Sequence, residues 1–335
     1  MDVMILLFSL IIILIGAEAF TNALEHIGEK MGISEGVTGS IFAAVGTAMP
    51  ETMVPIFAIL GGTGSAELRH DVGIGAILGA PLMLSTLAFF LLGLFAVKQR
   101  GWRGVFQPEP TGLARDLTWF NYAFAFGVLA VLIPPDWLVA RGFISLMLIL
   151  LYVGYLYVTI KASAGLVEEG HATEADHPLY LQKIGLPNHI LVIVFQLGLG
   201  LLFILLGAKG FVYGVEGLAA WIGISALALS LLIIPIATEL PEKVNSLIWT
   251  SRGRDTLAFG NITGAMVFQG SLLPALGIAM TPWVPHREMI AGMVMTLLAA
   301  TYLSIVIRRG GALKAIHLFI NGLCYIIFVV AVLWG

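Results

Sequence analysis

Charge is scarce in this chain of 335 residues: Asp, Glu, Lys and Arg make up 11%, whereas 59% of the residues are hydrophobic. With a mean hydropathy of +0.98, the composition excludes an ordinary soluble domain. The single cysteine, Cys324, excludes an intrachain disulfide and a cysteine cluster for zinc or iron–sulfur. The 17 basic residues form no tract and the net charge is −3, which excludes a nucleic-acid partner. The composition therefore indicates a polytopic membrane protein.

Apolar runs of about 20 residues, the length that crosses a bilayer, predict ten transmembrane helices. They are expected near 3–24, 33–60, 71–97, 117–133, 141–160, 188–208, 222–250, 255–281, 287–307 and 314–334. Ala17-Glu18-Ala19 resembles a signal-peptide cleavage site, but the residues before it include Asp2 and no basic residue, so we expect an uncleaved first span. The fourth span is short because Pro134-Pro135 ends it. If this span did not cross the membrane, all later segments would lie on the opposite side.

The Lys and Arg residues of the loops predict the orientation. With ten spans, twelve of them fall on one side and four on the other, while Lys243 lies inside a span. The positive-inside rule then places both termini outside and the polar linker 161–187 in the cytoplasm. We expect an integral protein of a prokaryotic-type plasma membrane. The linker is interpreted as a solvated connection; a weak regulatory metal site built from its acids and histidines is the alternative.

Two motifs recur in register along the chain. Gly32-Ile33-Ser34 returns as Gly223-Ile224-Ser225 at an offset of 191, and the same offset carries Thr47-x-x-Pro50-Glu51 onto Thr238-x-x-Pro241-Glu242. In the next span, the segments 75–80 and 260–265 match at an offset of 185, with glycines at the first and fifth positions of each segment. The chain therefore consists of two copies of one unit.

Each copy holds five spans, an odd number, so the second copy must be inverted in the membrane. The predicted fold is an all-α polytopic membrane protein of ten transmembrane helices in two inverted five-helix repeats. The first repeat is expected at 1–160, the cytoplasmic linker at 161–187 and the second repeat at 188–335. Inverted repeats are typical of secondary transporters, whose substrate site lies near the midplane between the two copies.

The repeated residues suit a hard cation. A proline inside a helix frees the carbonyl four residues earlier, and a threonine one turn before a glutamate adds a hydroxyl on the same face. Calcium binds six to eight oxygens, which two facing half-sites could supply. The proposed ligands are the carboxylates of Glu51 and Glu242, the hydroxyls of Thr47 and Thr238, and the freed carbonyls of Gly46 and Ala237.

Each proline could also be a plain kink, and each threonine hydroxyl could bond back to its own helix. The carboxylates are harder to explain structurally, because an ionised Glu at bilayer depth usually lines an ion path or pairs with a countercharge. Asn261 could add an amide oxygen, and Glu239 is a third acid. Lys243 lies four residues after Glu239, so an internal salt bridge is the simplest expectation. Alternatively, one of the pair titrates or supplies a tethered ammonium, replacing a sodium ion.

At this point the motifs resemble a known family. Gly-x-Ser, then Thr-x-x-Pro-Glu, then a Gly-Asn-x-x-Gly helix is similar to the α-repeats of the calcium/cation antiporter superfamily, of the sodium/calcium exchanger type. The resemblance covers both repeats, about 110 residues, and extends in topology to the whole chain. It implies electrogenic or proton-linked calcium exchange, with Glu51 and Glu242 as central ligands and Thr47 and Thr238 beside them.

This chain departs from the family's pattern in its side-chain oxygens. Ala48 and Glu239 stand where the family usually has Ser, and Ala76 stands where it has Asn. Val72 and Leu257 occupy positions that are polar in family members. Several side chains that hold sodium in the family are thus absent, so we expect weaker dependence on sodium.

The predicted function is a secondary-active antiporter that exchanges a divalent cation, most simply calcium, against a monovalent ion by alternating access. Proton coupling instead of sodium coupling is the alternative. From other classes, an intramembrane hydrolase lacks a Ser/His arrangement inside the spans, and a receptor or structural membrane protein would leave the matched Pro-Glu pairs unexplained. We expect no enzyme activity and no cofactor. The expected partners are the lipid bilayer and inorganic cations, and the sequence indicates no oligomeric state.

Overall fold

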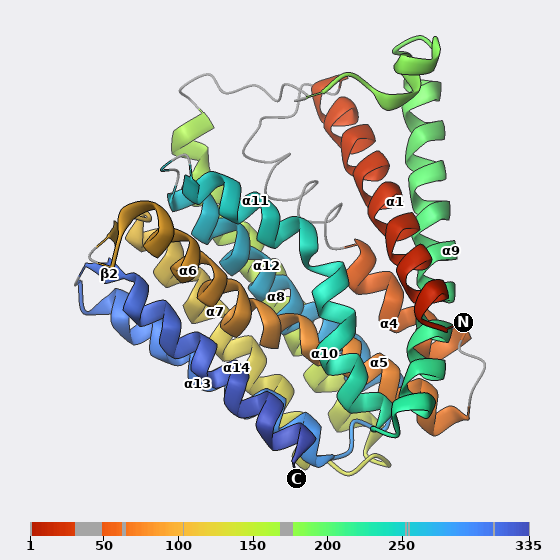
Figure 1. The fold of residues 1–335 in the computed structure, drawn as a ribbon, viewed down its shortest axis with the longest axis vertical. Coiled ribbons are helices and arrows are strands. Elements are labelled where there is room, and N and C mark those ends of the chain that lie inside the picture. The colour runs from red at the N-terminus through yellow and green to blue at the C-terminus, as the bar shows by residue number, and fades with distance from the viewer. Residues whose placement is uncertain are drawn as a thin grey trace. The chain divides into compact units, whose positions relative to one another are not determined.

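The computed structural model describes residues 2–30, 49–61, 65–102, 104–167, 177–251, 253, 255–310 and 312–334. Within these residues the chain is helical apart from short connections and two strands of two residues each (Figure 1). Seven of the described helices are long and apolar enough to cross a membrane, and two more apolar helices are shorter. These findings confirm an all-α polytopic membrane protein and fit the predicted ten spans.

The helices follow the predicted spans with shifted ends. They are α1 Asp2–Lys30, α4 Met49–Gly61, α5 Ala66–Met83, α6 Phe89–Arg100, α7 Pro110–Leu129, α8 Leu138–Val167, α9 Ile190–Ile222, α10 Ala226–Thr238, α11 Leu240–Ser251, α12 Asp255–Met280, α13 Arg287–Arg308 and α14 Ala315–Leu333. Most helices continue past the apolar run, because backbone hydrogen bonding does not stop where hydropathy does. The span predicted at 222–250 is two helices, and only the later part of the span predicted at 33–60 is described.

Contacts divide the chain into two compact units. The first comprises 1–63 and 153–218, and the second comprises 64–152 and 219–335. Each unit therefore takes segments from both halves of the sequence. This division by contact differs from the division into repeats, whose boundaries remain a prediction.

In the first unit, α1 and α9 run side by side in opposite directions (Figure 1). A Cβ added at Gly16 would lie 2.8 Å from the carbonyl oxygen of Gly200, and one at Gly207 would lie 2.9 Å from that of Ser9. The repeat offset of 191 carries Ser9 onto Gly200 and Gly16 onto Gly207. The two close contacts are thus each other's symmetry mates, as an inverted repeat requires.

The end of the linker binds across α1 and α9. Gln196 of α9 accepts from the backbone N–H of Leu181 at 3.0 Å and donates to Asn22 of α1 at 2.9 Å. Asn22 in turn donates to the carbonyl of His177 at 3.2 Å. Leu179 is fully buried in the first unit. These bonds place the end of the linker at the end of α1, on the side predicted to be cytoplasmic for both.

In the second unit, contacts between loops test the predicted sidedness. Strand β1 Val105–Phe106 pairs with β2 Leu313–Lys314 in antiparallel register. Arg100 makes two hydrogen bonds to Asp255, at 2.8 and 2.7 Å, and one to the carbonyl of Thr250 at 2.7 Å. The loops after α6, α11 and α13 therefore share one side, as predicted for three cytoplasmic loops.

Arg141 marks the opposite end of the second unit. Its guanidinium is buried and donates to the carbonyls of Pro282, Ile278 and Thr281, where α12 ends. A cation at a helix C-terminus satisfies carbonyls that have no intrahelical partner and complements the helix dipole. The loops before α8 and after α12 thus lie together, as predicted for two outside loops.

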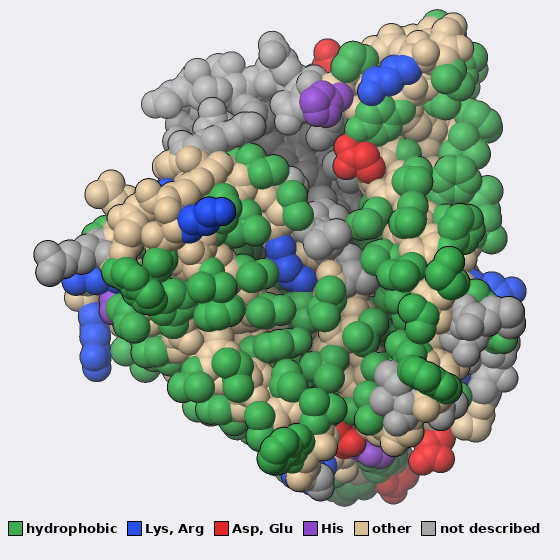
Figure 2. Space-filling model, viewed as in Figure 1, with side chains coloured by type: hydrophobic (Ala, Val, Ile, Leu, Met, Phe, Trp, Pro, Cys, Tyr) green, Lys and Arg blue, Asp and Glu red, His purple; other side chains and the backbone are tan. Residues whose placement is uncertain are grey.

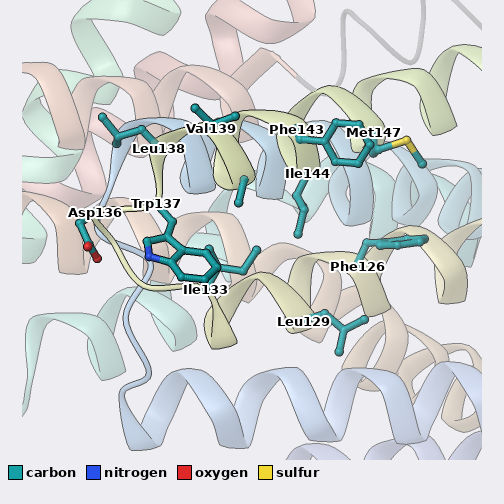
Figure 3. Close-up of a pocket in the computed structure, with 11 residues that line it drawn as sticks. Phe126, Leu129, Ile133, Asp136, Trp137, Leu138, Val139, Phe143, Ile144 and Met147 are labelled. Atoms are coloured by element: carbon teal, nitrogen blue, oxygen red, sulfur yellow. The ribbon is translucent and has the colours of Figure 1, made fainter.

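Lipid-facing surface and an apolar groove are visible on the second unit. Hydrophobic side chains are widespread on the face shown in Figure 2. In the second unit, Phe143, Leu146 and Leu150 of α8 are more than half exposed. A groove of about 830 Å³ lies between the end of α7 and the start of α8, with Trp137 inside it and Asp136 at one end (Figure 3). Its lining is almost wholly apolar, so it does not suit a cation.

The tightest helix contact in the second unit joins α5 to α10. A Cβ added at Gly75 would lie 2.5 Å from the Cβ of Ser230, and one at Gly79 would lie 2.5 Å from the Cγ of Pro235. Both positions also meet α10 backbone within 3 Å. The glycines at 75 and 79 therefore let α5 touch the backbone of α10.

We expect Gly75→Ala to lower the free energy of unfolding by about 1–3 kcal/mol, because the added methyl overpacks this contact. Thermal unfolding of the detergent-purified protein measures the change. Gly142→Ala is the matched control, since nothing lies within 4 Å of a Cβ there, and the substitution should be neutral or slightly stabilising. Equal thermal stability of the two variants would contradict the close contact.

Candidate functional site

The second copy of the repeated motif lies at a break between two helices. α10 ends at Thr238, Glu239 forms a turn, and α11 begins at Leu240 (Figure 1). Pro241 has no N–H, so the carbonyl of Ala237 loses its helical partner. Broken membrane helices are tolerated where their freed backbone groups line a binding site.

Glu242 lies in the first turn of α11 and is 3% exposed. The positive end of the helix dipole favours a carboxylate there. Glu239 is fully buried, and its carboxylate oxygens come within 4.8 Å of those of Glu242. Two buried carboxylates this close repel each other unless a cation or a proton sits with them.

Gln269 of α12 holds Glu239 in place. Its amide nitrogen donates to Oε1 of Glu239 at 2.6 Å, and the Gln269 side chain is 1% exposed. Oε2 of Glu239 and Oε1 of Gln269 are buried and have no hydrogen-bond partner among the described residues. A buried oxygen without a partner costs about 1–3 kcal/mol. The pair therefore presents two oxygens that a bound cation would satisfy.

The predicted salt bridge between Glu239 and Lys243 does not form within the described residues. The ammonium of Lys243 instead donates to the carbonyl of Pro235 at 3.1 Å and to the sulfur of Met83 at 2.9 Å. Glu239 is bound by Gln269, and its own carbonyl accepts from the backbone N–H of Lys243 at 3.2 Å. The backbone keeps the i,i+4 register between the two residues, but their side chains take other partners: Gln269 for Glu239, and Pro235 and Met83 for Lys243.

Two other predicted residues have structural partners. Thr238 is buried and its hydroxyl donates to the carbonyl of Ile234 at 3.2 Å, the back-bonded geometry. Asn261 donates to the carbonyl of Glu242 at 3.1 Å and to the hydroxyl of Ser246 at 3.0 Å. Asn261 therefore ties α12 to the first turn of α11 and so holds Glu242 in position.

The first copy of the motif belongs to the other unit. Glu51 is 3% exposed and lies in the first described turn of α4, with Pro50 before it. It is therefore buried at the position that Glu242 holds in α11. Gly46 and Thr47 lie outside the described residues.

Gln269 was not among the site residues predicted from the sequence. The available signal was an amide in an otherwise apolar stretch of the span 255–281, eight residues after Asn261. Polar side chains at such depth usually face the interior of a helix bundle and a functional group. Its partner is Glu239, 30 residues earlier, and no local spacing predicts that pairing.

Comparison with known proteins identifies the family. The sequence matches the family described as sodium/calcium exchanger protein over residues 1–161 and 192–334. The chain belongs to the sodium/calcium exchanger family. Among its relatives, CaxA of Alkalimonas amylolytica is 27% identical over 322 residues, covering 93% of this chain and 91% of CaxA. The inner membrane protein YrbG of Escherichia coli is 24% identical over 278 residues, covering 83% of this chain and 79% of YrbG.

Solved structures of exchangers share the fold of this family member. The H⁺/Ca²⁺ exchanger CAX superposes with a TM-score of 0.71 at 15% identity, covering 99% of this chain and 86% of CAX. The sodium–calcium exchanger NCX_Mj gives a TM-score of 0.57 at 20% identity, covering 97% of each chain. Family membership confirms the predicted class, a cation antiporter of the membrane, and makes the chain a transporter.

Proposed function

We propose that this exchanger moves one divalent cation, most simply calcium, outward against an inward flow of monovalent ions by alternating access. Glu51 and Glu242 supply the central carboxylates, because they are buried and occupy equivalent positions of two inverted repeats. The remaining predicted ligands are Glu239, Thr47, Thr238 and Asn261, with the carbonyls of Gly46 and Ala237. Gln269 joins this set. In this proposal the exchanger uses no cofactor; the only bound ions are those that it transports.

The observation that carries this proposal is the broken helix α10–α11. It brings the carboxylates of Glu239 and Glu242 within 4.8 Å in a buried place. Two buried oxygens there, Oε2 of Glu239 and Oε1 of Gln269, have no hydrogen-bond partner in the described part of the chain. Hard cations such as calcium prefer this set of carboxylate, amide and carbonyl oxygens. No arrangement for nucleophilic catalysis accompanies it in the described residues.

A second candidate is proton coupling. Ala48, Val72, Ala76 and Leu257 offer no side-chain oxygen where the family commonly has one, which disfavours sodium. Glu239 adds a carboxyl group that is fully buried beside Glu242. A carboxyl in such a place can hold a proton in one half of the cycle and a cation in the other.

Flux into proteoliposomes tests the function. Purified protein is reconstituted, and uptake of calcium, magnesium and manganese is followed under imposed sodium and proton gradients. We expect calcium uptake that is driven by one of the two gradients and absent from protein-free vesicles. Transport of no divalent cation under either gradient would contradict the proposal.

The absolute orientation is also proposed: both termini outside, in a plasma membrane, with the linker in the cytoplasm. In a Cys324→Ala background, a membrane-impermeant thiol reagent should label Asp136→Cys in intact cells and leave Lys183→Cys unlabelled. Both positions are exposed in the structure, so opening the cells should expose Lys183→Cys to the reagent. Labelling of Lys183→Cys in intact cells would reverse the assignment.

A further inference from the structure

Lys243 is a buried charge that divalent exchange by itself does not require. The side chain is 6% exposed, although it lies next to the proposed ligand Glu242 in the chain. Its ammonium donates to a backbone carbonyl at the broken end of α10, that of Pro235, and to the sulfur of Met83 on α5. These two acceptors are neutral, and the thioether is a weak one. These two hydrogen bonds help to fix the ammonium in place.

The charge of Lys243 is balanced by the acids of the site. Lys243 follows Glu242 directly in the chain, its backbone N–H donates to the carbonyl of Glu239 at 3.2 Å, and carboxylate oxygens of Glu239 and Glu242 lie within 4.8 Å of each other. A buried ammonium persists where carboxylates compensate it. In their ionised forms these three side chains of the second unit carry two negative charges and one positive charge. The lysine therefore acts on the same carboxylates that we assign to the transported ions.

Counting charges gives the consequence for ion exchange. With Glu51 included, as the proposed function has it, three carboxylates and one ammonium leave a net charge of −2. One divalent cation neutralises that charge, and so do two monovalent ions. Without the ammonium the net charge would be −3, and one further monovalent cation would have to enter with the divalent ion.

We propose that the Lys243 ammonium is a tethered monovalent cation, which takes the place of one ion that would otherwise be bound and carried. The exchanger then moves one divalent cation against two monovalent ions with no net movement of charge. An ammonium suits this role because it is compact, lies beside two acids, and is held by a carbonyl near the broken end of α10. This inference rests on the proposed function and specifies its stoichiometry.

The test uses the full-length protein in proteoliposomes whose membrane potential is set with potassium and valinomycin. For the unmodified protein, initial calcium uptake should change less than about twofold between 0 and −100 mV, although each uncompensated charge would couple to about 2.3 kcal/mol. Lithium, sodium or choline on the calcium side should not raise the rate of the unmodified protein. Uptake that accelerates tenfold or more at −100 mV would overturn the inference.

Lys243→Met supplies the second arm of the test. This variant should take up calcium slowly, and lithium or sodium on the calcium side should raise the rate about tenfold or more, because the ion replaces a missing charge. Choline should not raise the rate, because it is too large to occupy the place of the missing ammonium. In Lys243→Arg, as in the unmodified protein, added monovalent ions should not raise the rate of calcium uptake. Lys209→Met is the matched control, because Lys209 is exposed on α9, and it should behave like the unmodified protein.

Each outcome bears on the inference separately from the function. A folded Lys243→Met protein that shows the same indifference to monovalent ions as the parent would overturn the tethered-cation role, while divalent exchange would stand. If Lys243→Met does not fold, Lys243→Gln is substituted, and the potential measurement on the unmodified protein decides without any variant. Failure of the unmodified protein to exchange divalent cations would defeat the proposed function itself.

Discussion

Glu242→Gln should reduce divalent exchange about a thousandfold while leaving the protein folded. At an effective dielectric constant of about 20, a unit charge 4 Å from a divalent cation contributes about 8 kcal/mol. Loss of about half of that gives a thousandfold effect, because 1.4 kcal/mol corresponds to a factor of ten. Glu51→Gln should have the same effect, because the repeat makes the two residues equivalent. Calcium flux in proteoliposomes, with thermal unfolding as a check of folding, measures both variants.

The matched control for these variants is Glu67→Gln, an exposed acid at the start of α5. It makes the same chemical change outside the proposed site and should leave flux near the parent value. If either Glu51→Gln or Glu242→Gln kept flux near that of the parent, the ligand assignment would be wrong. Loss of flux in the control as well would point to a general effect of surface charge.

Glu239→Gln has the second largest expected effect, on coupling. If protons drive the exchange, calcium uptake should rise with an imposed pH gradient in the parent protein. A carboxyl must lose its proton to bind a cation, whereas an amide has no such proton, so the variant should lose most of that dependence and keep some exchange. Initial rates at a series of imposed pH gradients give the slope for each protein.

Gln269→Glu is a useful companion to that variant, because it alters the partner of Glu239 and adds a titratable group at 2.6 Å. It should change the dependence on the pH gradient, not abolish it. Uptake that needs sodium, ignores the pH gradient and survives Glu239→Gln unchanged would reject proton coupling. It would also mean that other oxygens replace those missing at Ala48, Val72, Ala76 and Leu257.

Periodic and repeated features were predictable from the sequence. The apolar runs predicted the helices, since lipid requires satisfied backbone and apolar side chains over a fixed length. The repeat predicted that Glu51 and Glu242 occupy equivalent buried positions, because an ionisable side chain at that depth must have a function or a partner. The close contacts of Gly16 and Gly207 in α1 and α9 then obeyed the same offset.

Features that depend on tertiary contacts were not predictable. The pairing of Glu239 with Gln269 joins two helices, so no local spacing reveals it. The expected Glu239–Lys243 salt bridge followed from i,i+4 spacing alone, whereas tertiary partners, Gln269 on α12 and Met83 on α5, hold the two side chains. The strands β1 and β2 are too short to leave a pattern. The back-bonded hydroxyl of Thr238, by contrast, was one of the two alternatives that the sequence left open.

The central claim is that Glu51 and Glu242 bind one divalent cation together. Crystals of the protein grown with manganese, whose anomalous scattering locates it, test this claim most directly. We predict a single strong anomalous peak per chain with a carboxylate oxygen of Glu51 and one of Glu242 as its ligands, lost in Glu242→Gln. A peak that involves only one of these glutamates, or one that persists in Glu242→Gln, would contradict the claim.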